Sequence, residues 1–338
     1  MNPKSHIMVT GGAGYIGSHM LLALNANNLM PVVFDNLSRG HKDSIIDTIL
    51  FQGDLRSISD LRSFFSNFNI CVVIHFAGLT YVEESVKNPD LYYENNVIGT
   101  LNLIKIMKEF NVNKIVFSSS CAVYGEPLEL KIREDHRTLP ISPYGENKLE
   151  IESYLKNKSK EGLKSISLRY FNAAGSDIQG RIGEQHDPET HLIPLVLEEA
   201  LRLLKGGISA DTKLKIFGND FSTKDGTPIR DYIHVEDLCD AHMLAIRRLL
   251  TNELIAAEFY NLANENGFSV IDVINAARNV TGQPITYQIL SRRKGDPAIL
   301  VGDASNAKKN LKWSPKHKKL DAIIESAWRF MLKKEKVN

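Results

Sequence analysis

The stretch HIMVTGGAGYIGSH, residues 6–19, decides the fold of this chain. Its first residues, His6–Thr10, form an apolar run that predicts a strand, and the apolar spacing after the turn predicts a helix. The turn between them holds Gly11, Gly14 and Gly17. Glycine lets a backbone approach a phosphate pair closely, and a helix N-terminus offers free N–H groups to it. The spacing is GxxGxxG rather than GxGxxG, and its place after a strand predicts a dinucleotide-binding turn.

Short apolar runs alternate with helical patterns through the first half of the chain. Further strands are expected at Pro31–Phe34, Leu50–Phe51, Cys71–Phe76, Lys114–Ser118 and Ser165–Tyr170, and helices at Leu101–Phe110 and Pro143–Asn157. This alternation predicts a parallel sheet covered on both faces. The expected fold class is therefore α/β, a doubly wound parallel (Rossmann) sheet with a smaller mixed α/β substrate-binding region at the C-terminus.

The regular alternation ends about halfway along the chain, where Gly, Asp and Pro cluster. A helix at Leu192–Leu204 and an extended run at Ile229–Val235 are expected beyond that point. We expect a dinucleotide-binding domain over residues 1–175, which also receives segments around 229–262. A substrate-binding region over 176–338 is expected to interleave with it and to pack over the carboxyl ends of the sheet.

Composition narrows the classes of function. The chain has 338 residues, 43% of them hydrophobic, and a formal net charge of +1, so no electrostatic argument supports binding to nucleic acid or to an anionic membrane. No apolar run is long enough to span a bilayer, and the N-terminus lacks the apolar core of a signal peptide. Cys71, Cys121 and Cys239 are widely spaced and odd in number. We therefore expect a reduced, cytoplasmic protein with no structural metal.

Two aspartates follow predicted strands. Asp35 ends the second strand, where a carboxylate can accept hydrogen bonds from the ribose hydroxyls of an adenosine and would repel a 2′-phosphate. The position favours NAD over NADP, although a plain turn or cap residue is the alternative interpretation. Asp54 stands where the third strand would end, and it either reaches the adenine or caps a loop.

Tyr144 and Lys148 form the second decisive pattern. Ser142 and Pro143 are typical of an N-cap and of the first helical position, so Tyr144 is expected in the first turn of a helix. Lys148, four residues later, shares its face. A free tyrosine has a pKa of about 10, which a close ammonium lowers toward the range of a useful base. Ser120, just after the fifth predicted strand, can pass a proton between a substrate oxygen and the phenol. The set predicts hydride chemistry at an alcohol carbon.

Eight segments carry a resemblance to a known family. They are TGGAGYIGSH (10–19), HFAGL (75–79), NNVIGT (95–100), FSSSCAVYG (117–125), SPYGENK (142–148), RYFNAAG (169–175), IFGND (216–220) and IRDYIHVEDL (229–238). With them the chain resembles the nucleotide-sugar epimerases of the extended short-chain dehydrogenase/reductase family, from about residue 7 to 330. The C-terminal segments are the more specific, because many relatives share the others.

The resemblance implies an enzyme of galactose metabolism, a homodimer with tightly held NAD and a UDP-hexose substrate. It implies reversible inversion at C4 of UDP-glucose and UDP-galactose. In that scheme Tyr144 takes the proton of the 4-hydroxyl, Ser120 assists, and a hydride passes from C4 to NAD. The 4-keto sugar then turns about its diphosphate, and the hydride returns to the other face.

The same resemblance assigns residues to each ligand. It implies cofactor contacts from Gly11, Gly14, Tyr15, Ile16, Gly17, Asp35, Asn36, Asp54, Leu55, Phe76, Ala77, Gly78, Asn96, Lys148 and Phe171. It implies catalytic roles for Tyr144, Lys148 and Ser120. It implies substrate contacts from Ser120, Tyr144, Asn172, His191, Leu192, Phe217, Arg230, Arg293 and Asp296. Arginines can offer paired donors to a diphosphate, and Arg292 is the alternative to Arg293.

Three positions depart from or refine the family pattern. Thr80 stands where some members have a lysine that contacts the cofactor, which puts the strength of NAD retention in question. His191 replaces an asparagine of some members and has either a hydrogen-bonding or a plain structural role. Leu300 falls where the family tunes the size of the pocket, and its bulk argues against N-acetylated sugars.

Three alternative functions share the fold. A 4-epimerase of UDP-N-acetylglucosamine or UDP-glucuronate would differ only in pocket residues. A nucleotide-sugar dehydratase or decarboxylase would carry an acid after Ser120, where this chain has Cys121 and Ala122. A non-enzymatic sensor or scaffold could dispense with Tyr144 or Lys148, and both are present here.

Overall fold

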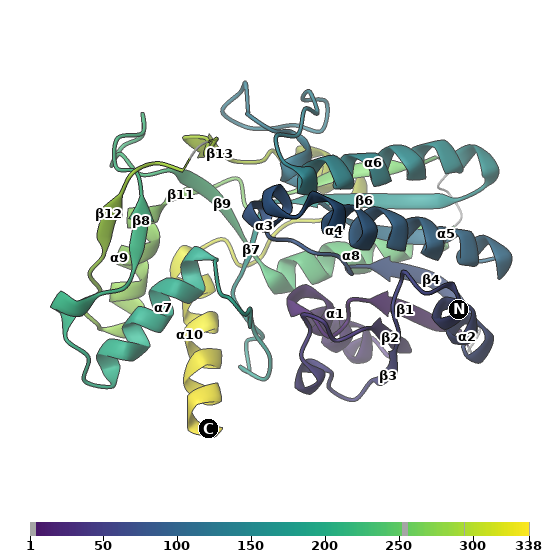
Figure 1. The fold of residues 1–338 in the computed structure, drawn as a ribbon, viewed down its shortest axis with the longest axis horizontal. Coiled ribbons are helices and arrows are strands. Elements are labelled where there is room, and N and C mark those ends of the chain that lie inside the picture. Colours follow the sequence, from purple (N-terminus) through teal and green to yellow (C-terminus); the bar gives the residue numbers. More distant parts are fainter. Residues whose placement is uncertain (1–4, 252–255, 294, 338) are drawn as a thin grey trace.

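A computed structural model of the chain describes residues 5–251, 256–293 and 295–337. Within these residues, seven parallel strands form one large sheet, which lies on the right in Figure 1. In spatial order they are β10 (Glu258–Leu262), β6 (Lys164–Tyr170), β5 (Lys114–Ser120), β4 (Ile70–His75), β1 (His6–Thr10), β2 (Pro31–Asp35) and β3 (Ile49–Gln52). This arrangement confirms the predicted fold class.

Helices cover both faces of the large sheet. They are α1 (Tyr15–Ala26) and α8 (Val235–Leu250) on one face, and α2 (Ile58–Asn67), α5 (Gly99–Glu109) and α6 (Pro143–Lys158) on the other. The alternation of side chains along a strand explains the two layers, because successive residues point to opposite faces. On β1, Ile7 and Val9 join the first layer, whereas Met8 joins the second. All three side chains are fully buried.

The strand order reverses at β1. This strand pairs with β2 on one side and with β4 on the other. The chain adds β2 and β3 on one side of β1, and then crosses over to add β4 on the other side. In doubly wound sheets such a reversal opens a crevice at the carboxyl ends of the two central strands, and ligands bind there. The carboxyl ends of β1 and β4 are therefore the expected site.

The second region lies on the left in Figure 1. Among the described residues, three short strands pair with β9 (Ile229–His234) to form a four-stranded sheet, and two more pair with each other. The strands are β7 (Asn172–Ala174), β11 (Gly267–Ser269) and β13 (Ile299–Leu300) against β9, and β8 (Lys215–Phe217) with β12 (Gln288–Leu290). Their helices are α7 (Leu192–Leu204), α9 (Val270–Thr281) and α10 (Leu320–Val337), which share a third hydrophobic core.

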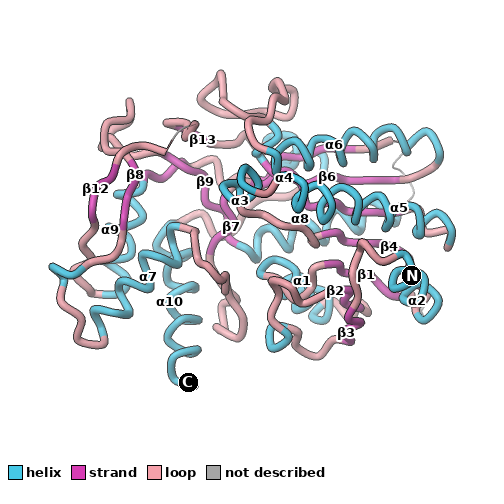
Figure 2. Tube along the Cα trace, in the orientation of Figure 1, coloured by secondary structure: helices cyan, strands magenta, loops and turns pink. Residues whose placement is uncertain are grey.

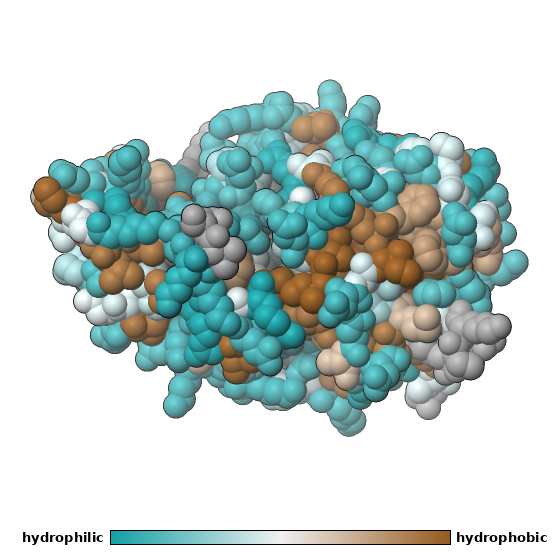
Figure 3. Space-filling model, turned by 90° about the horizontal axis from the view of Figure 1, so that it is seen from below, coloured by the Kyte–Doolittle hydropathy of each residue, from teal (hydrophilic) through white to brown (hydrophobic). Residues whose placement is uncertain are grey.

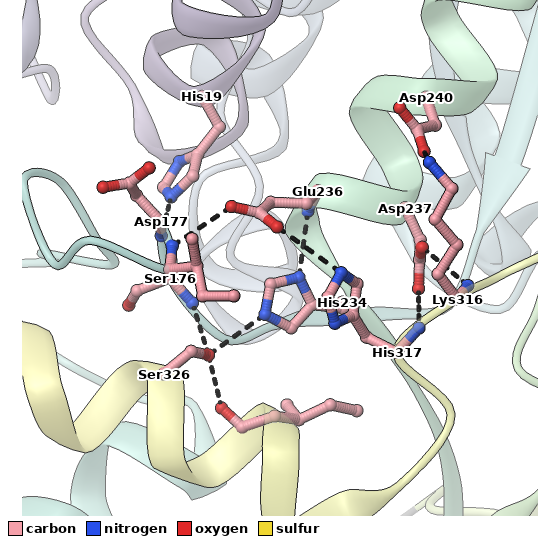
Figure 4. Close-up of polar contacts among 12 residues, drawn as sticks. His19, Ser176, Asp177, His234, Glu236, Asp237, Asp240, Lys316, His317 and Ser326 are labelled. Atoms are coloured by element: carbon pink, nitrogen blue, oxygen red, sulfur yellow. Dashed lines mark hydrogen bonds and ion pairs between the residues drawn. The ribbon is translucent and has the colours of Figure 1, made fainter.

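One long loop joins the two regions. In Figure 2 it is drawn in pink between β7 and α7, and it passes between α1 and α10. Figure 4 shows how it is fixed: the backbone N–H of Asp177 donates 3.0 Å to His19 Nε2 on α1, and the N–H of Ser176 donates 3.0 Å to Ser326 Oγ on α10. The loop thus holds the second region against the carboxyl edge of the sheet.

Most predicted elements are confirmed, with shifted ends. Strand β5 continues through Ser120 rather than stopping at Ser118, because its pairing with β6 extends to Tyr170. Of the segment 229–262, β10 belongs to the large sheet and β9 to the small one, and residues 252–255 lie outside the described residues. Two short helices, α3 (Val82–Lys87) and α4 (Pro89–Tyr92), precede α5. In the described part of the chain, no helix has the length and hydropathy that a membrane crossing requires.

Candidate active site

A cleft of about 460 Å³ follows the carboxyl edge of the large sheet and reaches the second region. The predicted residues that line it are Gly11, Gly14, Tyr15, Ile16, Gly17, Asp35, Asn36, Asp54, Leu55, Phe76, Ala77, Gly78, Ser120, Tyr144, Phe171, Asn172, His191 and Arg230. Thr80 and Leu300 also line it. Among the described residues, the predicted Lys148, Asn96, Leu192, Phe217, Arg293 and Asp296 are not part of this lining.

Two glycines of the turn at one end of the cleft, Gly11 and Gly17, leave no room for a side chain. Gly11 has a φ of +68°, and a Cβ there would lie 2.6 Å from the backbone nitrogen of Ala77. A Cβ on Gly17 would lie 2.1 Å from the carbonyl oxygen of Gly11. Gly14 is the N-cap of α1 and has no side chain to occupy the first N–H groups of the helix. A close backbone with free N–H groups fits the pyrophosphate of a dinucleotide.

Asp35 closes the next strand beside this turn. Its two carboxylate oxygens accept hydrogen bonds from the backbone N–H groups of Ala13, at 3.0 Å, and Leu37, at 2.8 Å. Burial raises the pKa of Asp35, and these two hydrogen bonds oppose that effect. Each oxygen keeps a second lone pair, so the side chain can also accept from a ribose diol.

Asp54 follows the neighbouring strand β3, next to the end of β2 that carries Asp35. It accepts a 3.0 Å hydrogen bond from Asn36 Nδ2 and pairs with Arg56 at 2.7 Å. The hydrogen bond from Arg56 holds the pKa of Asp54 well below its usual range. An ionised carboxylate and an amide thus face the region where an adenosine would lie.

Asn96 supports the cleft from behind instead of facing it. The side chain is buried, and its Oδ1 accepts 2.8 Å from the N–H of Leu79, while its Nδ2 donates 3.0 Å to the carbonyl of the same residue. These bonds fix the loop that follows β4. The cofactor contact of Asn96 stays a prediction, and the neighbouring Asn95 lines the cleft.

Ser120 and Tyr144 meet where the large sheet faces the second region. Ser142 is the N-cap of α6, with its Oγ accepting from the N–H of Gly145 at 3.2 Å, and Pro143 is the first helical residue. Tyr144 therefore lies in the first turn, as predicted. Ser120 ends β5, and its hydroxyl lowers the pKa of the Tyr144 phenol beside it in the cleft lining. The two oxygens form one proton-transfer pair at the wall of the cleft.

The acidity of Tyr144 differs from the sequence-based expectation. Burial raises the pKa of Tyr144 to about 12, although the hydrogen bond with Ser120 lowers it. The expected effect of Lys148 is weak because its ammonium nitrogen lies 5.7 Å from the centre of the Tyr144 ring and donates 2.7 Å to the carbonyl of Ser118. Burial lowers the pKa of Lys148 itself to about 8. In the chain alone, Tyr144 is thus a neutral phenol at pH 7.

The expected substrate residues of the second region form two pairs. Arg230, which lines the cleft, pairs with Asp296, and its Nη1 donates 2.7 Å to the carbonyl of Ile229. The Arg293 guanidinium lies over the Phe217 ring at 3.9 Å. The alternative arginine, Arg292, pairs instead with Asp220 at 2.5 Å and stacks on the Phe221 ring. Leu192 is the first residue of α7.

Other cleft residues were missed by the sequence analysis. They are Arg39, His41, Tyr81, Tyr170 and the loop residues Gly183, Glu184, Gln185 and His186. The first three follow the ends of β2 and β4, so their place after a predicted strand was an available signal. The loop residues reach the cleft only through tertiary packing. Burial lowers the pKa of His191, but hydrogen bonds with Glu184 and Glu189 raise it to about 10.

Comparison with known proteins places this cleft in context. Residues 7–263 match the profile of the NAD dependent epimerase/dehydratase family. The chain is 48% identical over 325 residues to a UDP-glucose 4-epimerase of Halalkalibacterium halodurans, across 96% of this chain and 95% of that protein.

Solved structures are similar over nearly the whole length. The crystal structure of UDP-glucose 4-epimerase from Brucella ovis in complex with NAD has a TM-score of 0.90 and 40% identity, covering 96% of this chain and 98% of that one. The enzyme from Bifidobacterium longum, in complex with NAD+ and UDP, has a TM-score of 0.90 and 35% identity, covering 98% and 99%.

Proposed function

Because the chain belongs to the NAD dependent epimerase/dehydratase family, we propose that it is an NAD-dependent isomerase that interconverts UDP-glucose and UDP-galactose. The observation that carries the proposal is the position of the Ser120–Tyr144 pair, in the same cleft as the glycine turn and Asp35. The glycine turn can bind a dinucleotide. The Ser120–Tyr144 pair can exchange a proton with a bound alcohol while that alcohol is oxidised and then reduced again.

The reaction inverts the configuration at C4 of the hexose. Bound NAD supplies a reversible hydride acceptor for that carbon. Tyr144 takes the proton of the 4-hydroxyl while Ser120 holds the same oxygen, and the sugar becomes a 4-ketone. The ketone then turns about its diphosphate and presents its other face. The hydride is given back to C4 on that face and Tyr144 returns the proton to the oxygen, so that atoms and electrons balance over the cycle.

The phenol has to ionise for this chemistry, against a pKa that burial raises to about 12. A positive charge beside Tyr144 lowers the free energy of the phenolate, and it acts strongly at a buried site. Lys148 lies beneath the cleft, 5.7 Å from the Tyr144 ring, and the oxidised cofactor carries a cationic ring. We propose that Lys148 also holds the nicotinamide ribose, since its ammonium is on the same helix as Tyr144 and within 5.7 Å of its ring.

The uridine diphosphate is held by the second region. Arg230 offers a guanidinium to the diphosphate from the wall of the cleft, and Asp296 orients it. Arg293 and Phe217 lie stacked and provide a cation and a ring for the remaining phosphate and the base. Asn172, at the start of β7, and Leu192, at the start of α7, complete the proposed set, and His191, the N-cap of α7, lies beside them.

The hexose itself is proposed to be glucose or galactose. Leu300 lines the cleft and is half-buried there, so its side chain occupies space that an N-acetyl group would need. The 4-epimerases of UDP-N-acetylglucosamine and UDP-glucuronate remain the second candidates. Incubation with UDP-galactose and, separately, with UDP-N-acetylgalactosamine tests the choice by NMR of the sugar protons. Inversion of UDP-galactose should be much the faster, and equal rates would contradict the proposal.

We further propose a homodimer. Large hydrophobic side chains are exposed on α3, α4 and the turn that follows them: Val82, Val86, Leu91, Tyr93 and Ile98. Figure 3 shows that hydrophobic side chains also gather in the middle of one face. Exposed apolar patches are typical of interaction surfaces. Light scattering after gel filtration should give twice the chain mass, and Val86→Glu should lower it. A monomeric wild type would contradict the proposal.

A further inference from the structure

Two glutamates and two histidines converge in the loop before α7. His186 Nδ1 lies 3.2 Å from Glu184 Oε1 and 3.7 Å from Glu189 Oε2. His191 Nδ1 lies 3.0 Å from Glu184 Oε1 and 3.1 Å from Glu189 Oε1. One atom from each of the four side chains lies within 4.8 Å of all the others. The four ligand-type atoms therefore surround one point.

These separations match the edges of a metal-centred tetrahedron. Zn²⁺ holds imidazole nitrogen and carboxylate oxygen at about 2.0–2.1 Å, which separates neighbouring ligand atoms by about 3.3 Å. Three of the nitrogen–oxygen separations, 3.2, 3.0 and 3.1 Å, involve Glu184 Oε1 and Glu189 Oε1, and the fourth, 3.7 Å, runs from His186 Nδ1 to the other oxygen of Glu189. A charge-assisted hydrogen bond between nitrogen and carboxylate is shorter, at about 2.7–2.9 Å. The 3.7 Å separation leaves His186 and Glu189 without a direct hydrogen bond, and an ion shared by the four side chains would fill this gap.

The two carboxylates of the cluster are nearly buried, and His191 is its exposed member, with 40% of its side chain accessible. The side chains of Glu184 and Glu189 are 9% and 8% exposed. His186 Nδ1 is buried, and within the described part of the chain it makes no hydrogen bond of acceptable geometry. Buried polar atoms almost always have a partner. The missing partner of this nitrogen is therefore expected to be an ion held between it and the two carboxylates.

A second group of histidine and glutamate, His234, Glu236 and His317, differs from this one (Figure 4). His234 Nδ1 accepts a 3.1 Å hydrogen bond from the N–H of Glu236, and its Nε2 is 3.0 Å from Ser326 Oγ. Both ring nitrogens of His234 are thus already used. That group has no imidazole nitrogen left on His234 for a metal, and it serves as an internal control.

We propose that Glu184, His186, Glu189 and His191 bind one divalent transition-metal ion, with Zn²⁺ the best match. Imidazole nitrogen and carboxylate oxygen both bind Zn²⁺, and four protein ligands complete its tetrahedral coordination, although three of them also line the cleft. The ion takes the place of the ring protons. The sequence analysis expected no metal because it looked for cysteine pairs. The signal it missed is the repeated Glu-x-His at 184–186 and 189–191.

The site fastens the loop over the mouth of the cleft. The carbonyl of Gln185 lies 3.1 Å from His41 Nε2, and the carbonyl of Asp187 accepts 3.3 Å from Arg39 Nη1. Both partners belong to the segment after β2 that lines the cleft. A bound ion fixes the loop against this segment and slows the release of a dinucleotide. The metal site thus has a structural role, because it holds the loop in position and takes no part in the proposed reaction.

The test uses the full chain after treatment with a chelator. Binding of Zn²⁺ is measured by calorimetry and binding of Co²⁺ by the visible absorption of tetrahedral Co²⁺, both without substrate. The wild type should bind one ion per chain. His186→Gln should bind at least about 100-fold more weakly, since even loss of an outer partner costs 10–100-fold. His41→Gln and His317→Gln should bind as the wild type does.

Two results would overturn the site. One is a wild type that binds no better than His186→Gln, and the other is a loss of binding in His317→Gln. If His186→Gln does not fold by circular dichroism, Glu189→Gln replaces it, with the same expectation. Because no step of the assay uses a sugar nucleotide, failure of the metal site is distinguishable from failure of the proposed activity.

Discussion

The ammonium of Lys148 donates a 2.7 Å hydrogen bond to the backbone carbonyl of Ser118 beneath the cleft. This bond joins α6, which carries Tyr144, to β5, which carries Ser120. One turn further along the helix, Glu152 accepts a 2.6 Å hydrogen bond from Ser119 and pairs with the buried Arg169 at 2.6 Å. The elements that carry Ser120 and Tyr144 are therefore fastened to each other by buried contacts, while both side chains line the cleft.

Tyr144→Phe tests the proton carrier. The substitution removes one oxygen and keeps the ring, so the fold and the dinucleotide turn should be unaffected. Turnover of UDP-galactose should fall by far more than tenfold, while the NAD content of the purified protein stays at the wild-type level. Activity above a tenth of the wild type would exclude Tyr144 as the base.

Lys148→Met separates catalysis from stability. Burial lowers the pKa of Lys148 to about 8 from its ordinary 10.5, so the unfolded chain binds the proton more tightly than the folded one. This group therefore adds stability as pH rises from about 8 to 10.5, and it costs stability below that window. The free energy of unfolding in urea should therefore rise by about 2 kcal/mol more in the wild type than in the variant between pH 7 and pH 10.

The same variant should lose nearly all turnover at both pH values. A stability difference that does not change with pH would show that Lys148 is not buried as described. Unchanged turnover would show that it has no part in the reaction.

Gly17→Ala and Gly14→Ala form a matched pair at the turn. A Cβ on Gly17 would lie 2.1 Å from the carbonyl oxygen of Gly11, whereas one on Gly14 would lie 3.3 Å from the same atom. The clash at Gly17 forces the backbone of the turn to move, which should cost about 1–3 kcal/mol of folding free energy. Because the moved turn no longer fits the dinucleotide, Gly17→Ala should lose its NAD. Absorbance of bound dinucleotide after gel filtration measures this. Equal losses in both variants would contradict the geometry of the turn.

Leu300→Ala tests the choice of sugar. Removing bulk from the cleft wall should raise the rate with UDP-N-acetylgalactosamine relative to UDP-galactose. Ile299→Ala, the adjacent residue of β13, is the control because Ile299 is outside the cleft lining in the described residues. An unchanged substrate ratio in Leu300→Ala would remove this side chain from the specificity determinants.

The local part of the site could be predicted from the sequence. The glycine turn, Asp35 and the Tyr144–Lys148 spacing depend on a strand, a turn and a helix that are encoded within a few residues of each other. The alternation of strands and helices likewise predicted the parallel sheet. These features need no knowledge of distant contacts, and the structure places them where the spacing indicated.

What depends on packing could not be predicted. Strands as short as β12 and β13 exist because partners pair with them, and their own residues give no periodic signal. The high pKa of Tyr144 comes from burial, which the helix pattern does not contain. The place of Lys148 beneath the cleft, and the meeting of Glu184 with His191, follow from how the chain folds back on itself.

The central claim is that the hydrogen at C4 leaves and returns as a hydride within one closed cleft. Conversion of UDP-galactose carrying deuterium at C4, in ordinary water, tests this most directly. The account predicts that the UDP-glucose formed keeps the deuterium at C4, as read by NMR or mass spectrometry. Replacement of that deuterium by solvent hydrogen would contradict it.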